Sequence, residues 1–219
     1  MGYSRNFALN TAFLYFLFLP GQAIHSQNYD KKIEKLALEI ESQVIDWRHW
    51  FHENAELSNR EFKTSKRIAT ILRDMGYKPQ INVAKTGVVA VLNGKERGPV
   101  VALRADIDGL PIKERVDIPW ASKMTGVYNG ETVPVMHACG HDTHIGILLG
   151  VAKILKDMKD QIPGKVKFIF QPAEEGAPDG EEGGAELMVK EGVLKNPNVD
   201  AIFGLHITVS YTHLRAHET

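Results

Sequence analysis

The hydrophobic pattern predicts several amphipathic helices along the chain. Between residues 33 and 50, apolar side chains recur at intervals of three or four positions, as on one face of a helix. These side chains are Ile33, Leu36, Ile40, Val44 and Trp47. A second stripe follows the sequence HACGHDTH and consists of Ile145, Leu148, Leu149, Ala152, Leu155 and Met158. A shorter helix is expected near residues 185–191.

A further helix is predicted from its boundary signals. Ser58 is followed three residues later by Glu61, the spacing of a capping box, in which the two side chains bond backbone amides at a helix start. Gly76 supplies a stop after Met75. We therefore expect a helix that opens in this segment and runs to about Met75, with its polar face in solvent.

Runs of apolar and β-branched residues predict the strands. Residues 86–92 and 99–104 are two such runs joined by a glycine-containing turn, which predicts a β-hairpin. Further strands are expected at KVKFIF and DAIFGLH, whereas residues 111–134 form a looser stretch. Because strands alternate with helices, the fold class predicted is α/β, a sandwich with a mixed sheet.

Composition and charge narrow the class of partner. The chain has 219 residues, of which 43% are hydrophobic, and this suits a packed core. Lys and Arg total 26 against 27 for Asp and Glu, and no long basic run occurs. Nothing in this pattern supports nucleic acid as a partner, so a small-molecule substrate is expected.

The start of the chain has the order of a secretory signal. Arg5 precedes an apolar run over residues 7–19, which small and polar residues follow. The run is shorter than the roughly 20 apolar residues that a membrane-spanning helix needs. We expect residues 1–26 to be a signal peptide that is removed, leaving an exported protein, periplasmic or secreted, with no membrane attachment. A retained N-terminal anchor is the alternative.

Residues of the kinds that bind metals follow predicted strands and turns. Cys139 and His141 lie in HACGHDTH, Glu174 and Glu175 in QPAEE, and His206 ends the last strand. Chemistry in α/β proteins gathers outside the carboxyl ends of strands, so we expect these side chains at one edge of the sheet. Thiolate, imidazole and carboxylate together suit zinc or a similar first-row ion better than magnesium or calcium.

Each of these residues also has an ordinary interpretation. Cys139 is the single cysteine, so it forms no internal disulfide, and a buried inert thiol is the alternative to a metal ligand. Glutamate pairs are usually solvated. In extended backbone, however, Glu174 and Glu175 would point oppositely, so that one could bind metal while the other faces bound water. The five residues together indicate a metal site more specifically than any one of them does alone.

The elements RADIDGLPI, HACGHDTH, QPAEEG and GLH, in this order and at these separations, resemble the aminoacylase and carboxypeptidase-like amidohydrolases. That group includes hippurate hydrolases and hydrolases of indole-acetyl amino acids. The resemblance runs from about Trp47 to His206. It implies the mixed-sheet α/β/α sandwich of the zinc-exopeptidase type and two divalent metal ions, zinc or manganese, with cobalt as a further option.

The resemblance also implies roles for individual residues. The family's metal ligands match Cys139, His141, Glu175 and His206, and its general base matches Glu174. Three further residues resemble supporting groups around the ligands, and ordinary polar or capping roles are equally open for them: Asp106, Asp108 and His144.

Metal chemistry then predicts a mechanism. A water held by paired ions has a pKa lowered towards neutrality, so Glu174 could take its proton and pass it to the leaving nitrogen. Attack on the carbonyl would release a carboxylic acid and an amine. The predicted function is hydrolysis of the amide bond of N-acyl amino acids or short peptides.

The resemblance ends after Ile207. Residues 208–219 are interpreted as a tail foreign to the fold, which makes His213 and His217 poor ligand candidates. In the family, a further histidine beyond an inserted lid or dimerisation domain completes the site, and a homodimer is expected for the full-length form.

Residues 27–207 are therefore predicted to be the N-terminal part of a catalytic domain, truncated before that inserted domain and the final strands. A catalytically incompetent truncated fragment and a metal-binding scaffold of the same fold are the alternatives.

Overall fold

The computed structural model describes the backbone of residues 21–208 and the side chains of residues 29–208. Most of the predicted signal peptide, and the predicted tail beyond Thr208, lie outside the described residues. The chain divides into two compact units, residues 1–35 and 36–219, and the site lies in the second. Within the described residues, no helix is both long and apolar enough to cross a membrane.

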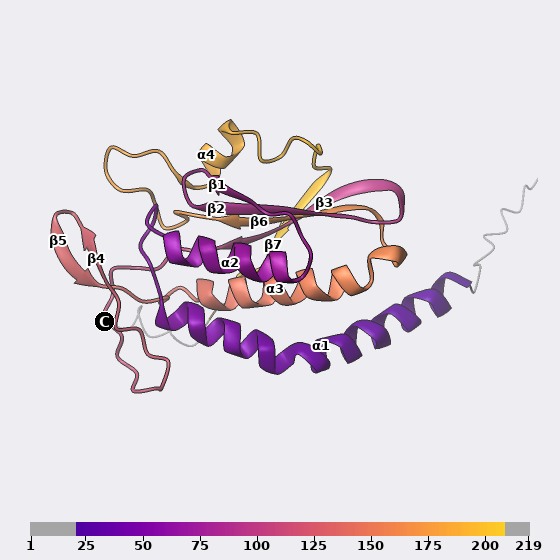
Figure 1. Cartoon of the computed structure of the whole chain (residues 1–219), viewed down its shortest axis with the longest axis horizontal. Coiled ribbons are helices and arrows are strands. Elements are labelled where there is room, and N and C mark those ends of the chain that lie inside the picture. The colour runs from indigo at the N-terminus through magenta and orange to yellow at the C-terminus, as the bar shows by residue number, and fades with distance from the viewer. Residues whose placement is uncertain (1–20, 209–219) are drawn as a thin grey trace, which may run out of the picture. The chain divides into compact units, whose positions relative to one another are not determined.

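Helices and strands alternate along the described chain, as the sequence pattern predicted (Figure 1). The helices are α1 (Gly21–Glu53), α2 (Phe62–Asp74), α3 (His141–Asp157), the short 3-10 helix η1 (Lys159–Gln161) and α4 (Gly184–Lys190). The strands are β1 (Gln80–Val83), β2 (Gly87–Asn93), β3 (Glu96–Asp106), β4 (Thr125–Tyr128), β5 (Glu131–Pro134), β6 (Pro163–Gln171) and β7 (Ala201–Gly204). Helix α1 crosses the boundary between the two units.

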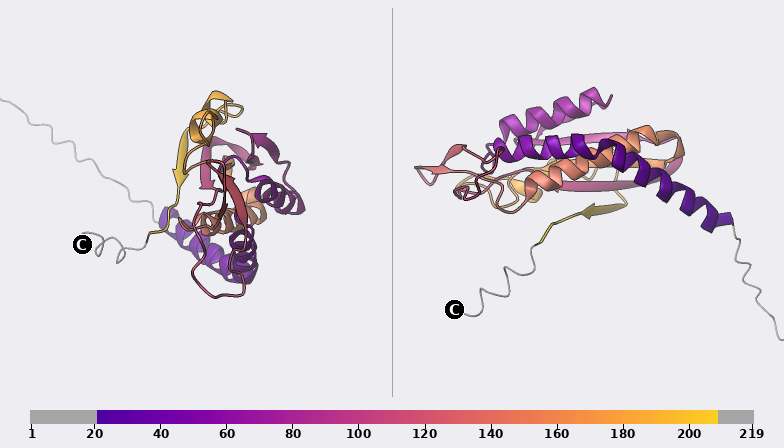
Figure 2. Two further views of the ribbon diagram at one scale, coloured as in Figure 1. Left: turned by 90° about the vertical axis from the view of Figure 1, so that its left-hand side faces the viewer. Right: turned by 90° about the horizontal axis from the view of Figure 1, so that it is seen from below.

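The main sheet is mixed, as predicted, with the strand order β1-β2-β6-β3-β7. Strands β3, β6 and β7 are mutually parallel, whereas β2 runs antiparallel to β6 and β1 antiparallel to β2. Helices α2 and α3 cover one face and α4 lies on the other, which makes an α/β/α sandwich (Figures 1 and 2). The carboxyl ends of three parallel strands therefore lie at the same edge.

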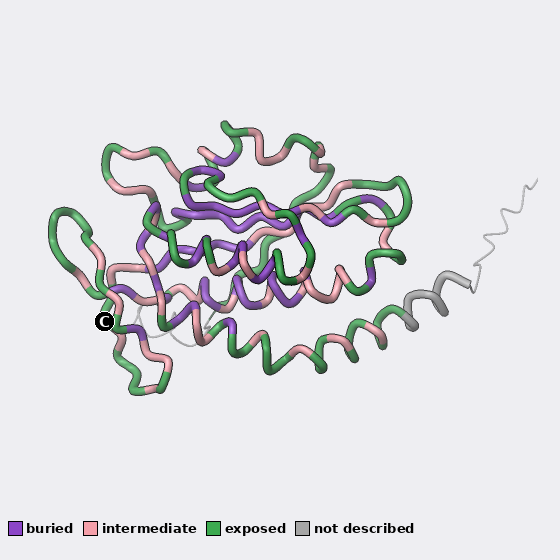
Figure 3. The backbone as a smooth tube through the Cα atoms, in the orientation of Figure 1, coloured by how far each residue is buried: buried purple, intermediate pink, exposed green. Residues whose placement is uncertain are grey.

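Alternate side chains of each central strand enter cores on opposite faces of the sheet. The core under α2 and α3 includes Val88, Ala90, Phe168 and Phe170. The core on the other face includes Val89, Ala102, Ile169 and Met188 of α4. Burial is densest along the central strands and the inward turns of α2 and α3 (Figure 3). Each large apolar side chain buried there contributes roughly 1.5–3 kcal/mol.

The predicted helical stripes mostly face the core. In the second unit, Leu36, Ile40 and Val44 of α1 are half-buried and Trp47 is buried. Ile33, in the first unit, is exposed. The stripe of α3 is buried except for half-buried Leu155. Helix α2 ends as predicted, with Gly76 in the left-handed region at φ 78°.

The predicted hairpin of residues 86–104 is wrong, because β6 lies between β2 and β3. The connecting turn bonds to the start of β6: the amide of Gly94 donates to the carbonyl of Gly164 at 3.0 Å. A Cβ atom at Gly94 would lie 2.0 Å from the carbonyl oxygen of Ile162, and one at Gly164 would lie 2.0 Å from that of Pro99. Two glycines thus permit the close crossing that separates the strands.

The loose stretch of residues 111–134 contains a hairpin that the prediction missed, made of β4 and β5. Asn129 and Gly130 form its turn with φ values of 50° and 81°. Positive φ at both central residues is the geometry that favours Asn-Gly in two-residue hairpin turns. The dipeptide Asn129-Gly130 was therefore a signal for this hairpin in the sequence.

The predicted capping box is also wrong. Helix α2 begins at Phe62 without a side-chain cap from Glu61. Its cap is Glu56, whose carboxylate accepts the amide of Thr64 at 2.9 Å. The hydroxyl of Ser58 instead donates to Oδ2 of Asp108 at 2.7 Å. The side chains of Ser58 and Glu61 therefore bond to distant segments of the chain, at Asp108 and Ala173, and not to the start of α2.

Candidate metal centre

The predicted site residues meet at the carboxyl edge of the parallel strands. Strand β3 ends at Asp106, and β6 is followed by the turn that carries Glu174 and Glu175. His206 follows β7, and His141 is the first residue of α3. Strand polarity therefore brings together residues that are far apart in the sequence, as predicted.

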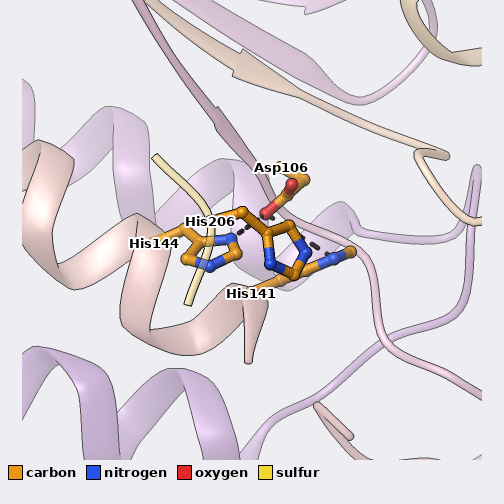
Figure 4. Close-up of side chains that lie close together, drawn as sticks. All are labelled: Asp106, His141, His144 and His206. Atoms are coloured by element: carbon orange, nitrogen blue, oxygen red, sulfur yellow. Dashed lines mark hydrogen bonds and ion pairs between the residues drawn. The ribbon is translucent and has the colours of Figure 1, made fainter. Parts of the chain in front are cut away.

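Two groups of side chains could each hold a cation. In the first, ligand atoms of Cys139, His141 and Glu175 all lie within 4.8 Å of one another. In the second, the same holds for Asp106, His141, His144 and His206 (Figure 4). His141 belongs to both groups, so the two candidate positions are adjacent.

His141 carries the clearest mark of a ligand. Its side chain is fully buried, and its Nδ1 donates to the carbonyl oxygen of Asp108 at 2.8 Å, which leaves a lone pair on Nε2. Among the described residues, Nε2 has no hydrogen-bond partner. Carboxylate oxygens of Glu174 and Glu175 lie 3.6 and 3.7 Å from it. A buried, unpaired nitrogen among acids fits a divalent cation.

The charges around His141 agree with this fit. Burial lowers the pKa of its imidazole, but hydrogen bonding to Asp108 and the charge of Asp106 raise it above the usual value overall. Without a metal, the acids therefore draw a proton to the ring. A divalent ion would compensate the same negative charge while using the lone pair of Nε2.

Cys139 is held as a thiol by its surroundings. Burial, followed by the neighbouring carboxylate of Glu175, raises its pKa to about 12. Its Sγ lies 3.4 Å from Nε2 of His206, whose Nδ1 donates to the carbonyl of Ile207 at 2.7 Å. A bound cation would reverse this preference, because metal coordination deprotonates a thiol. The thiol of Cys139 and Nε2 of His206 are therefore close enough to be ligands of the same ion.

Asp106 and His144 form a supporting pair behind His141. Asp106 is fully buried, and its Oδ2 accepts a hydrogen bond from Nη1 of Arg104 at 2.7 Å. Although burial raises the pKa of Asp106, its bond to His144 and the charges of His141 and Arg104 lower it overall, so the carboxylate is ionised. Arg104 was not among the predicted site residues. Its position two residues before Asp106, on the same face of β3, was the signal.

Asp108 joins the histidine to the glutamate turn. Its Oδ2 accepts the amide of Glu175 at 3.0 Å as well as the hydroxyl of Ser58. Its Oδ1 lies 3.3 Å from Nδ1 of His141. Burial raises the pKa of Asp108, but hydrogen bonds from His141 and Ser58 outweigh it, so the pKa is lowered. This carboxylate supports two candidate ligands at once.

Glu174 and Glu175 do not point oppositely, contrary to the expectation for an extended segment. The segment is a turn, with Ala173 in the left-handed region at φ 48°. Both carboxylates therefore approach Nε2 of His141 from this turn. Glu174 keeps 33% of its side chain exposed, and its Oε1 lies 3.9 Å from Nη2 of Arg104. It is thus accessible from solvent as well as close to the centre.

A cavity of about 160 Å³ opens beside Glu175. Its lining includes Leu57, Leu110, Pro111 and Tyr128 together with the charged Arg60. Strand β4 supplies Tyr128, so the unpredicted hairpin forms part of the wall. The cavity provides room for a small organic group next to the candidate metal centre.

Comparisons with known proteins agree with this geometry. Residues 102–214 match the sequence pattern of Peptidase family M20/M25/M40. The chain is 45% identical over 182 residues to thermostable carboxypeptidase 2 of Saccharolobus solfataricus, covering 83% of this chain and 43% of that protein. It is 42% identical to the N-acyl-L-amino acid amidohydrolase of Geobacillus stearothermophilus, covering 81% of this chain and 44% of that enzyme.

A solved structure is similar as well. The YXEP protein of Bacillus subtilis, described as a dinuclear metal binding peptidase from the M20 family, aligns with a TM-score of 0.68 and 40% identity. The alignment covers 78% of this chain and 44% of that one. The chain thus spans less than half the length of these relatives.

Proposed function

Since the chain belongs to Peptidase family M20/M25/M40, we propose that it supplies the metal centre of an amidohydrolase acting on N-acyl amino acids or short peptides. The observation that carries the proposal is Nε2 of His141, buried and without a partner among the described residues, facing the carboxylates of Glu174 and Glu175. The relatives named for carboxypeptidase and N-acyl amino acid amidohydrolase activity support the reaction class.

Four residues would hold the ions in this proposal: Cys139, His141, Glu175 and His206. Together they offer a thiolate, two imidazoles and a carboxylate, a donor set suited to zinc, manganese or cobalt. Two ions are proposed, because the similar YXEP protein is described as a dinuclear metal binding peptidase and the candidate ligands fall into two adjacent groups. When bound, divalent ions lower the pKa of a water and polarise a carbonyl group.

Glu174 is the proposed general base. Its exposed carboxylate can accept a proton from a water beside His141 and deliver it to the leaving nitrogen of the amide. Arg104 lies close enough to hold one oxygen of Glu174 by charge attraction while bonding Asp106. The cavity next to Glu175 would receive part of the substrate.

A metal-binding scaffold without turnover would use the same ligands. Glu174 favours the enzyme, because a binding protein needs no second acid that is accessible from solvent and directed at the centre. We further propose that residues 1–26 are a signal peptide that is cleaved and that the protein is exported. Residues 208–219 are proposed to be a tail outside the fold, and the full-length form is proposed to be a homodimer.

Metal binding and hydrolysis test the proposal separately. The purified chain, freed of metal, would be titrated with zinc, manganese and cobalt, and bound metal counted per chain. Release of free amino acid would then be measured on a panel of N-acyl amino acids and dipeptides. Metal bound with turnover supports the enzyme, metal bound without turnover supports the scaffold or the incompetent fragment, and no binding contradicts the metal centre.

A further inference from the structure

Glu61 lies outside the metal centre but touches the turn that carries Glu174 and Glu175. Its side chain is fully buried. Its Oε1 accepts the backbone amide of Ala173 at 2.8 Å, and its Oε2 accepts the hydroxyl of Thr86 at 2.5 Å. One carboxylate therefore connects the start of α2, the approach to β2 and the turn after β6.

The turn needs such support because of its backbone conformation. Ala173 has φ 48°, in the left-handed region that residues with a Cβ atom adopt at a cost. A strained residue of this kind persists only where its surroundings hold it. Glu61 supplies the partner of its amide, and Gly184 packs closely against its carbonyl, where a Cβ atom would lie only 2.8 Å from the oxygen.

The turn is held at a second point two residues later. The amide of Glu175 donates to Oδ2 of Asp108 at 3.0 Å. Buried carboxylates from two other segments, Glu61 and Asp108, thus accept the amides on either side of Glu174. Burial raises the pKa of Glu61 to about 7, in keeping with an acid held away from solvent.

We propose that Glu61 is a positioning residue, which acts through Ala173 to orient Glu174 and Glu175 towards the metal centre. This inference rests on the proposed function for the roles of the two glutamates. It gives the ELSNREF segment a part in the site, although its Glu61 does not cap α2.

Amide hydrogen exchange of the 219-residue chain tests the proposal without any turnover. Glu61→Met keeps most of the side-chain volume but removes both acceptors. We expect the amides of Ala173 and Glu175 to exchange at least about tenfold faster in this variant, while core amides of β2 and β6 change much less. In Glu61→Gln one oxygen can still accept from Ala173, so exchange should stay close to that of the unsubstituted chain.

Cobalt binding supplies a second readout. The absorption spectrum of bound cobalt reports its ligands, and loss of a support behind a ligand lowers metal affinity by about 10- to 100-fold. Glu61→Met should bind cobalt at least about tenfold more weakly with an altered spectrum, and Glu61→Gln should restore both. If the unsubstituted chain binds no cobalt, the proposed function fails, while hydrogen exchange still decides whether Glu61 holds the turn.

Glu56→Gln is the matched control. Glu56 lies in the same segment and accepts amides at the start of α2. Within the described part of the chain, its side chain bonds Lys63 and Thr64 and not residues 172–176. This control should leave the exchange of Ala173 and the cobalt spectrum unchanged.

The proposal is overturned if Glu61→Met leaves the amides of Ala173 and Glu175 protected, or accelerates their exchange only as much as that of the core amides. Should Glu61→Met fail to fold, Thr86→Val, which removes one bond to Glu61, should still accelerate exchange at Ala173.

Discussion

The Nδ1 atom of His144 lies 2.6 Å from Oδ1 of Asp106. The other ring nitrogen of His144 accepts the amide of Ile207 at 3.0 Å. Both nitrogens are therefore used within the protein, and His144 has no lone pair left for a cation. Of the second group of candidate ligands, this leaves His141, whose Nε2 is unpaired among the described residues, and His206, whose Nε2 contacts the thiol of Cys139. The pair of Asp106 and His144 is then a support.

His144→Phe should therefore destabilise the chain while keeping the ligand atoms. The substitution retains a ring of similar shape but removes a hydrogen-bond donor to the buried carboxylate of Asp106. Leaving a buried acceptor without its partner costs about 1–3 kcal/mol, and more for a charged group. Urea unfolding of the two proteins measures the difference. A loss below about 1 kcal/mol, the range of exposed pairs, would show that the pair is not a buried support.

Glu174→Gln should retain metal and lose turnover. The amide cannot accept the proton of the attacking water, and general base catalysis contributes about 10²- to 10⁴-fold to a rate. Bound metal per chain and the rate of amino acid release are measured together. Glu186→Gln, which changes an exposed acid of α4, is the control. Undiminished turnover in Glu174→Gln would remove Glu174 from the role of base.

His52 should stabilise the fold more at low pH than at high pH. Its Nδ1 lies 3.1 Å from Asp142 and its Nε2 lies 2.7 Å from Glu114, so the ring donates twice when protonated. The bond to Asp142, aided by Glu114, outweighs burial and raises the pKa of His52. The stability it contributes is fully present below its ordinary pKa of about 6.5 and is lost as pH rises through the higher folded value.

Unfolding of His52→Gln and the unsubstituted chain at a series of pH values checks this sign. The difference in free energy of unfolding should be largest near pH 6 and shrink towards pH 9. Two other titratable groups lie near His52. Arg48 bonds Asp142, and His137 has a pKa that burial lowers to about 4. His137 is therefore neutral across this range, and a difference that grows with pH would contradict the assignment.

Lys167 should be important for stability and unimportant for metal binding. Its buried ammonium group, on the face of the sheet opposite α3, donates to the carbonyls of Val193, Lys195 and Pro197 at 2.8, 2.8 and 3.1 Å. Lys167→Met would leave these acceptors without their donor, at about 1–3 kcal/mol for each one that stays buried. Urea unfolding should show the loss, and a cobalt titration should show unchanged affinity.

The sequence alone determined the helices, the mixed sheet and the set of residues gathered at its edge. Ile145 and Leu149 of α3 and the runs of β2 and β6 follow periods that local geometry imposes. Parallel strands in an α/β sheet share one polarity, so residues after β3, β6 and β7 had to meet at one edge. Glu175 and His206 could therefore be expected at this edge from the sequence.

Only the tertiary structure decided which distant groups became partners. Strand β6 pairs with both β2 and β3, Ser58 and Glu61 bond Asp108 and Ala173, and His144 is occupied by Asp106. Hydrogen bonds of this kind join residues 38 to 112 positions apart, and no local period encodes them. They depend on which buried donors and acceptors are brought face to face when the sheet and helices pack.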